Sequence, residues 1–481
     1  MNTLAKPSGM SMERKLIVCA ILSTIFLAEK QLAAIFFIPA STDITHLSFG
    51  FGGYIDGIIN SGQFQSCNDI SCSQVSRMPG LPLFVSALSV FSQDQQAVAL
   101  IKNAIVSLLF IVLLGSVYLT SGRYRNAVLM TVMATLPIMI FSPAIVKHAS
   151  ALTYEEGFIL EFLPIWLIAS LLALTAMIYR DSGVALDKMS AISILLASFL
   201  FAFKASMIPL LILSSILGGL SVATNLKSRA MPRYTMASAI LLTGMLALWG
   251  QHHVRSTGQL SIMTSWDGEN LFRGANTQSV LLYPDTDLDR IFDSAIIVKT
   301  DGSIIPNTVM PSRDDFTTEA EWNDHYRNLA RNWIESDSSR YIKFTATKAR
   351  VFFLSVKKTP FKRGATNATD QRTLERLQDA AITVWMAFGR LSQFGLVVLV
   401  FAALARGGLA IPSTIATSLF CLAYASPYIV GFAYERHITP FLLMIYAGLV
   451  FNIFAYFFTC ARDSSKRGPA VSRYISGQDI R

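Results

Sequence analysis

Residues 41–84 read STDITHLSFGFGGYIDGIINSGQFQSCNDISCSQVSRMPGLPLF and follow the first long apolar run of the chain. This stretch combines two acidic residues, Asp43 and Asp56, with a pair of cysteines and an Arg-x-Pro-x-x-Pro segment that begins at Arg77. A connection between two helices is normally short and polar. Because this one is long and chemically varied, we expect it to form an active-site loop.

The composition of the whole chain is that of a membrane protein. It has 481 residues, of which 52% are hydrophobic and 15% charged, and its mean hydropathy is +0.47. These values are too apolar for a soluble protein of this length. The formal net charge of +9 does not indicate nucleic-acid binding, because the basic residues form short clusters between apolar runs, as topology signals do.

Ten apolar runs approach the roughly 20 residues that a helix needs to cross a bilayer. If the fifth and sixth runs were one span plus a buried helix, the basic residues at 227–233 would lie on the extracytoplasmic side of the membrane. Ten spans instead place the short basic segments on one side, which satisfies the positive-inside rule and makes both termini cytoplasmic. The predicted spans are 16–39, 97–119, 127–146, 157–179, 189–203, 207–224, 234–250, 383–404, 411–432 and 439–458.

This pattern predicts an all-α polytopic membrane protein of about ten transmembrane helices with an extracytoplasmic loop domain. In that domain, aromatic and leucine residues from Trp322 to Trp333 recur at helical spacing and predict an amphipathic helix. The predicted divisions are an N-terminal transmembrane module at 1–250 that includes the active-site loop at 40–84, an extracytoplasmic domain at 251–382, a C-terminal transmembrane module at 383–458, and a basic cytoplasmic tail at 459–481.

Several acidic residues fall on the predicted outer face of the membrane. A carboxylate held there could act as a general base toward an acceptor hydroxyl or amine. Asp43 and Asp56 are the first candidates, with a helix cap or a solvated loop position as the structural alternative. Glu155 and Glu156 stand where the fourth span begins, and the helix dipole alone could explain either of them.

Basic residues reach the same face of the membrane. Arg77, Lys204, Arg436 and His437 could neutralise a lipid phosphate, by bidentate contact in the case of arginine. Snorkelling, or pairing with the nearby acids, is the structural alternative. Lys204 has the fewest structural explanations, because it interrupts a hairpin between two apolar runs.

Two further features concern the compartment and the cofactor. A disulfide between Cys67 and Cys72 would suit an oxidising compartment, and it explains the pair better than a zinc site, which needs more ligands than this pair offers nearby. No phosphate-binding loop, dinucleotide fingerprint, zinc signature or haem motif stands in a supporting context. The sequence therefore indicates acid–base and phosphate-binding chemistry without an evident cofactor, and it does not indicate a divalent metal.

Four passages together resemble the membrane glycosyltransferases of the GT-C class, specifically bacterial relatives of the protein O-mannosyltransferases and of the lipid A aminoarabinose transferase. They follow one another in the order of that family and cover most of the chain. They are YIDGIINSGQF with SRMPGLPLF at 54–84, TYEEGFILEF at 153–162, NLFRGAN at 270–276 with the helical stretch at 321–353, and ERHITPFLL at 435–443.

The resemblance implies a donor in which a sugar is linked to a polyprenyl phosphate, and transfer with inversion outside the cytoplasmic membrane. It leaves open which of the two loop aspartates is the base. By implied role, the site residues are Asp56, Asp43 and Glu155 for catalysis, Arg77, Lys204, Arg436 and His437 for the donor phosphate, and Glu156, Trp266 and Asn270 for the acceptor side.

We therefore expect a glycosyltransferase of the bacterial inner membrane that moves a sugar to an envelope glycan, glycolipid or protein at the periplasmic face. Its expected partners are the lipid-linked donor, the acceptor and membrane lipids, and no nucleic acid. One alternative is a glycan polymerase or ligase that uses a polyprenyl-diphosphate donor. Another is a transporter or flippase, which should show repeated hydropathy and broken helices at mid-membrane.

Overall fold

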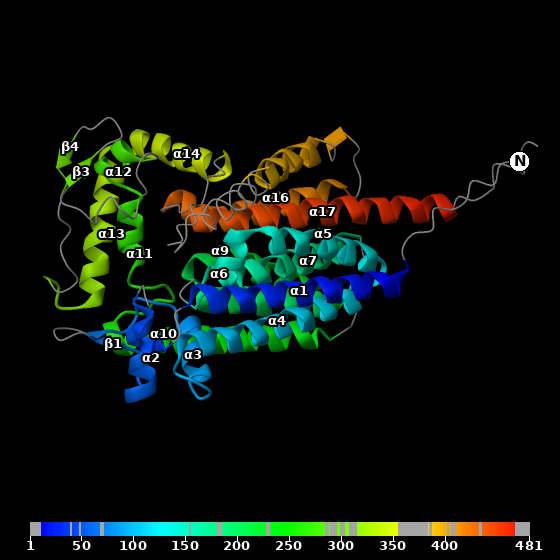
Figure 1. Ribbon diagram of the computed structural model, residues 1–481. Coiled ribbons are helices and arrows are strands. Elements are labelled where there is room, and N and C mark those ends of the chain that lie inside the picture. Colours follow the sequence, from blue (N-terminus) through cyan, green and yellow to red (C-terminus); the bar gives the residue numbers. More distant parts are fainter. Residues whose placement is uncertain are drawn as a thin grey trace, which may run out of the picture.

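The chain folds into a bundle of long apolar helices that carries a cap region at one end (Figure 1). We use the name cap region for the described part of residues 258–354, and cap end for the end of the bundle beneath it. The computed structural model describes residues 11–38, 41–47, 50–67, 72–152, 155–179, 185–227, 231–283, 288, 296–298, 304–306, 315–354, 383, 387–401, 404–405, 410–431 and 435–466.

The bundle confirms the expected fold class of an all-α polytopic membrane protein. Within the described residues, eight helices are long and apolar enough to cross a membrane, and they match eight of the ten predicted spans. The long bundle helices are α1 Met12–Phe37, α4 Gln95–Thr120, α5 Arg125–Phe141, α7 Glu156–Tyr179, α8 Leu186–Phe203, α9 Ile208–Lys227, α10 Arg233–Thr257, α16 Ala410–Val430 and α17 Glu435–Lys466.

The other two predicted spans also correspond to helices, which differ in length and polarity. Residues 234–250 lie within α10, a helix of 25 residues whose last turns include His252, His253 and Arg255. Of residues 383–404, the structure describes a shorter apolar helix at Ala387–Phe401. Residues 355–382, at the end of the predicted extracytoplasmic domain, and 467–481, in the predicted tail, lie outside the described chain.

The prediction of a hairpin at Lys204 is confirmed. α8 ends at Phe203, Lys204 has an extended backbone, and the short turn η4 (Ala205–Met207) leads into α9. Ser193 of α8 lies 2.9 Å from Ser214 of α9 between their hydroxyl oxygens, so the two helices pack side by side. The fifth and sixth apolar runs are therefore two separate helices.

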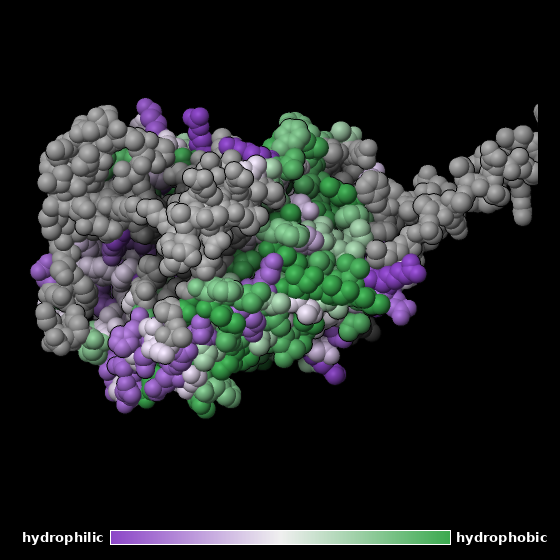
Figure 2. Space-filling view, in the orientation of Figure 1, coloured by the Kyte–Doolittle hydropathy of each residue, from purple (hydrophilic) through white to green (hydrophobic). Residues whose placement is uncertain are grey.

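Helix α7 forms the centre of the bundle. It is apolar on every side, and such a helix is stable only where it is buried. The side chains from Phe158 to Ala173 are almost entirely inaccessible to solvent. The peripheral helices instead expose apolar side chains, such as Ile240 and Leu248 of α10. Figure 2 shows apolar side chains along the flank of the bundle, with hydrophilic ones toward its two ends.

One ion pair is enclosed in the bundle. Lys30 of α1 donates to both carboxylate oxygens of Glu161 in α7, at 2.7 and 2.9 Å, and both side chains are buried. Asn103 of α4 donates to the Lys30 carbonyl oxygen at 3.1 Å. An unpaired charge is costly in such surroundings, so this pair ties α1 to α7.

The pair gives a stability prediction. We expect Lys30→Met to destabilise the protein by about 3–5 kcal/mol, because it leaves the Glu161 carboxylate buried without a partner. The double variant Lys30→Met/Glu161→Leu should recover most of this loss. Thermal unfolding in a fixed detergent measures both changes, and equal losses in the single and double variants would contradict this account.

The remaining elements are short and lie mostly at the cap end. The loop at 41–84 holds η1 Ile44–His46, α2 Phe51–Asp56, the π-helical turn η2 Gly57–Ser61, and the antiparallel strands β1 Ser66–Cys67 and β2 Cys72–Ser73. The others are α3 Gly80–Leu88, η3 Gly122–Tyr124, α6 Pro143–Ser150, α11 Asp267–Arg273, α12 Thr277–Leu282, the antiparallel pair β3 Ile296–Val298 and β4 Ile304–Pro306, α13 Glu319–Ser336 and α14 Ser338–Leu354.

The expected amphipathic helix is α13. Thr318 and Glu321 form a capping box at its start, so two backbone N–H groups of the first turn are satisfied. Trp322 and Tyr326 are buried against α11, whereas Leu329 is partly exposed. In Figure 1, α13 runs across the cap end of the bundle.

Candidate functional site

A cavity of about 460 Å³ lies where the cap region meets the bundle. Its lining comes from segments that are distant in the sequence: the loop at 76–78, the start of α7, the turn between α8 and α9, helix α11, and the junction of α16 with α17. Apolar, aromatic and charged side chains share this lining. Most of a small-molecule site's wall is usually apolar, with a few polar groups that fix the orientation of the ligand.

The cavity brings together seven of the ten site residues expected from the sequence. These seven share a position on its wall, and they are Arg77, Glu155, Glu156, Lys204, Trp266, Asn270 and His437. Arg436 belongs to the first turn of α17, but its side chain lies outside what the structure describes. Asp43 and Asp56 are described, and neither lines the cavity.

Both loop aspartates have local structural partners. Asp43 caps η1, where its Oδ1 accepts hydrogen bonds from the backbone N–H and the hydroxyl of Thr45, each at 2.8 Å. These hydrogen bonds hold the pKa of Asp43 below its usual value. Asp56 is exposed and accepts from Asn60 one turn later, at 2.6 Å. The placement therefore matches the structural alternative for both residues and does not support either as the base.

The floor of the cavity is a cluster of charged side chains around Lys204. Its ammonium contacts the Glu156 carboxylate directly and lies 3.8 Å from that of Glu155. His437 places its Nε2 3.4 Å from Glu156 Oε1 and stacks on the ring of Tyr428, with 4.1 Å between the centroids. The cluster thus joins the ends of α8, α7, α16 and α17.

Backbone packing behind the cluster explains why the two glutamates lie there. A side chain at Gly157 would place its Cβ 2.5 Å from the carbonyl oxygen of His148, so glycine allows α6 and α7 to approach closely. Lys102 of α4 donates to the carbonyl oxygens of Ala149 and Ala151, at 2.6 and 2.8 Å. The backbone from His148 to Ala151 is therefore held from two sides.

Arg77 forms part of the opposite wall, between two aromatic rings. Its guanidinium lies 4.1 Å from the ring centroid of Trp266 and 5.0 Å from that of Phe51. A guanidinium over a ring face is attracted by the ring quadrupole. This wall therefore presents a cation beside a flat apolar surface.

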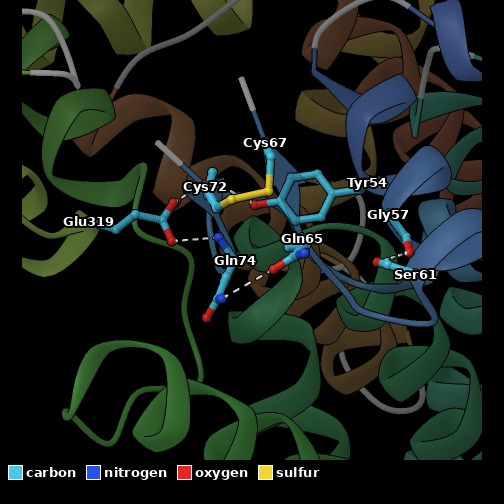
Figure 3. Close-up of a disulfide and its surroundings, with 9 residues drawn as sticks. Tyr54, Gly57, Ser61, Gln65, Cys67, Cys72, Gln74 and Glu319 are labelled. Carbon is cyan, nitrogen blue, oxygen red and sulfur yellow. Dashed lines mark hydrogen bonds between the residues drawn. A yellow bond between two sulfur atoms is a disulfide. The ribbon is translucent and has the colours of Figure 1, made fainter. Parts of the chain in front are cut away.

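The segment that carries Arg77 is held by Glu319, the first residue of α13. The Glu319 carboxylate accepts from the backbone N–H groups of Gln74 and Val75 at 2.7 and 3.0 Å, and from the hydroxyls of Ser73 and Ser265 (Figure 3). Such a carboxylate, saturated by donors, is a strong structural anchor. It fixes the loop at 73–77 to the cap region.

The expected disulfide is present and immediately precedes this anchor. Cys67 and Cys72 are bonded across the β1–β2 pair (Figure 3). Next to it, the Tyr54 hydroxyl lies 2.8 Å from that of Ser73 and 2.9 Å from that of Ser76. The loop at 41–84 thus contributes Phe51 and residues 76–78 to the cavity wall.

The sequence analysis missed Asp267, although it selected its neighbours Trp266 and Asn270. Asp267 lines the cavity at the start of α11, and its carboxylate accepts from the backbone N–H and the hydroxyl of Thr264. Burial raises the pKa of Asp267 to about 6, against the opposing effect of these hydrogen bonds and of Arg327. The sequence signal was its position, because Asp267 is an acid directly beside the selected Trp266 and close to the selected Asn270.

Two arginines on the cavity wall were also missed. Arg273 of α11 contacts Glu269, with its Nε 2.8 Å from Glu269 Oε1, and Arg327 of α13 lies 2.9 Å from Asp324. No group of three or more histidine, cysteine or acidic side chains in the described parts of the chain is arranged to hold a metal ion. The polar chemistry described at this site is that of paired charges.

Fold and site together define a multi-pass α-helical membrane protein with an amphipathic, charge-lined cavity at one end of its bundle. No protein-family model and no curated protein matches the sequence. Among solved structures, the chain is similar to an archaeal oligosaccharyltransferase, AglB from Archaeoglobus fulgidus, in complex with an inhibitory peptide and a dolichol-phosphate. The TM-score is 0.41 at 10% identity, over 95% of this chain and 52% of that one. This chain therefore spans about half the length of that protein.

The anchor at Glu319 gives a local prediction. We expect Glu319→Gln to accelerate hydrogen exchange at the amides of Gln74 and Val75 by at least about fivefold, since a hydrogen bond to a charged acceptor contributes about 1.5–3 kcal/mol. Hydrogen-exchange mass spectrometry of the peptide that contains both amides measures this. Glu335→Gln, at an exposed position of the same helix, is the control. Unchanged exchange in Glu319→Gln would show that the carboxylate does not hold the loop.

Proposed function

We propose that this chain is an integral membrane glycosyltransferase of the GT-C class. It moves a sugar from a polyprenyl-phosphate donor to an envelope glycan, glycolipid or protein at the periplasmic face of a bacterial inner membrane. The observation that carries the proposal is the shared cavity at the cap end of the bundle. There, the cations Lys204 and Arg77 face the carboxylates Glu155 and Asp267, between apolar spans and a polar cap.

The place of the cavity suits a substrate that is half lipid and half sugar. An isoprenoid chain partitions into the apolar environment of the spans, whereas a sugar and its acceptor need the polar cap. Lys204, at the tip of the α8–α9 hairpin, and Arg77 above it are positioned for the phosphate. Trp266 offers a ring face for the sugar. His437 contacts Glu156, so its proposed part is to orient that carboxylate.

The charge pattern favours a donor with one phosphate over a diphosphate. Lys204, Arg273 and Arg327 each already contact a carboxylate, and Arg77 lies between two rings. Little positive charge is therefore left to balance a ligand, which suits a phosphodiester with a single negative charge. A polymerase or ligase that uses a diphosphate donor would need stronger compensation.

The proposed reaction is a displacement at the anomeric carbon of the donor sugar. The acceptor hydroxyl forms a bond to this carbon as the bond to the phosphate oxygen breaks, and the phosphate leaves with the electron pair. Lys204 and Arg77 stabilise the charge that develops on the phosphate. The hydroxyl proton passes to a carboxylate on the cavity wall.

Asp267 is the carboxylate best suited to take that proton. A general base works best when its pKa is near the working pH, and burial raises the pKa of Asp267 to about 6. Glu155 is the second candidate and was among the catalytic residues expected from the sequence, but it lies beside the Lys204 ammonium. Asp43 and Asp56 have no part in the proposal, because they do not line the cavity.

Transport is the weaker alternative. A transporter is expected to gather its polar groups near the middle of the membrane. The charged residues that line the described cavity lie at the cap end instead. Lys30 and Lys102 lie deeper, about two turns inside α1 and α4 from the ends of these helices at Phe37 and Gln95.

The donor site gives the first functional prediction. We expect Arg77→Gln to weaken binding of a short-chain polyprenyl phosphate by at least about tenfold, since hydrogen bonds to a charged group contribute about 1.5–3 kcal/mol. Lys204→Gln should abolish sugar transfer in isolated membranes. Lys343→Gln, at an exposed site on α14, is the control. Unchanged donor binding in Arg77→Gln together with full transfer in Lys204→Gln would exclude this cavity as the donor site.

The base gives a pH prediction. A base must be unprotonated, and the pKa of Asp267 is about 6. The rate of transfer should therefore rise between about pH 5 and pH 7 and then level off. Asp267→Asn should lower the rate by about 10²–10⁴-fold and remove this rise. The profile is measured with saturating donor, and a rise that persists in Asp267→Asn but disappears in Glu155→Gln would assign the base to Glu155.

A further inference from the structure

Lys348 is a fully buried lysine that lies behind the cavity without lining it. Its ammonium lies 2.8 Å from each of three backbone carbonyl oxygens, those of Gly274, Val430 and Gly431. An ammonium has three donors, and these three acceptors use them all. The lysine belongs to α14, whereas its partners belong to two other parts of the chain.

The three carbonyl groups come from two walls of the cavity. Gly274 follows α11, which contributes Asn270 and Arg273 to the lining. Val430 is the last residue of α16, a membrane-spanning candidate, and Gly431 follows it; both line the cavity. Lys348 therefore lies where the cavity wall formed by the cap region meets the wall formed by a bundle helix. We call this contact between Gly274 and Val430–Gly431 the seam.

The same seam contains a close contact between two backbones. A Cβ added at Gly274 would lie 1.7 Å from the carbonyl oxygen of Gly431. The φ of Gly274 is −94°, which other residues adopt readily, so glycine is needed there for space. The Tyr341 hydroxyl also donates to the Val430 carbonyl oxygen, at 3.1 Å. Several independent contacts thus hold the two walls at one separation.

The end of α16 has an electrostatic need for such a cation. The last carbonyl groups of a helix have no donor within the helix, and they carry the negative end of its dipole. Lys348, whose side chain is buried, supplies donors and positive charge to the carbonyl groups of Val430 and of Gly431, which follows it. The other side of the cap region is held by Glu319 on the preceding helix, so α13 and α14 anchor the cap region at two separate points.

We propose that Lys348 is a positioning residue that fixes the α11 wall of the cavity against the end of α16 and so sets the width of the donor site. We call the three hydrogen bonds of Lys348 the clamp. The identity of the ligand rests on the proposed function, but the clamp does not. Loss of the clamp should let the walls separate and weaken donor binding, while the groups that face the reacting atoms stay intact.

The clamp is tested by a distance measurement that needs no substrate. Spin labels at Leu281 of α12 and Leu422 of α16, both exposed, report the separation of the cap region from that bundle helix. They are placed in the full-length protein after Cys19, Cys421 and Cys460 are replaced by alanine. Electron–electron resonance in nanodiscs should give one narrow distribution.

Two variants on different elements should widen that distribution. They are Lys348→Met, which removes the ammonium, and Gly274→Ala, which forces the backbones apart. The matched controls are Lys343→Met, at an exposed site on α14, and Gly219→Ala, where an added Cβ meets no atom within 4 Å. A distribution that stays narrow and unshifted in both test variants would overturn the clamp.

Donor binding provides the second readout. In both test variants, the dissociation constant of a short-chain polyprenyl phosphate should rise about tenfold, because the carbonyl groups lose their donor or their spacing. The KM for the sugar-linked donor should rise by the same factor, and kcat should stay unchanged. Wider distances with unchanged donor binding would overturn the positioning role. If the wild-type protein itself binds no polyprenyl phosphate, the proposed function fails, and the distance result alone decides the clamp.

Discussion

The contact between Lys204 and Glu156 joins the tip of the α8–α9 hairpin to the first turn of α7, the most buried helix of the bundle. Charged groups beside apolar spans are stable only with partners, so this contact restricts where the hairpin can lie. His437 contacts the same carboxylate and stacks on Tyr428, so the ends of α17 and α16 meet beside it. The floor of the cavity thus follows from the need to pair charges at the end of an apolar bundle.

The wall that the cap region contributes to the cavity follows from a second constraint. A polar segment that lies across the cap end must be attached to the rest of the protein at fixed points. Glu319 provides this attachment at the disulfide loop and Lys348 at the end of α16, each with a single buried charge saturated by hydrogen-bond partners. Arg77 is held between Phe51 and Trp266, one ring from each side of the attachment. The bundle and the cap region therefore form the cavity together, and neither part alone supplies all of its charged side chains.

The bundle could be predicted from the sequence because a bilayer imposes a length and a polarity on each span. The separation of α8 from α9 and the Cys67–Cys72 disulfide followed from equally local signals. The orientation of Asp43 and Asp56 could not be predicted. A loop carboxylate gives the same sequence pattern whether it caps a turn, faces water or faces a cavity. The role of Glu319 was out of reach as well, because Ser73 lies 246 residues away in the chain. Asp267 could have been considered, because it stands next to Trp266, which the sequence analysis had selected.

The central claim is that the cavity at the cap end binds the phosphate of a lipid-linked sugar donor. The most direct test is a cryo-electron microscopy structure of the protein in nanodiscs that contain a polyprenyl phosphate. The account expects phosphate density within hydrogen-bonding distance of the Lys204 ammonium and the Arg77 guanidinium, with the isoprenoid chain running toward the apolar spans. An empty cavity at saturating lipid, or phosphate bound at another place, would contradict it.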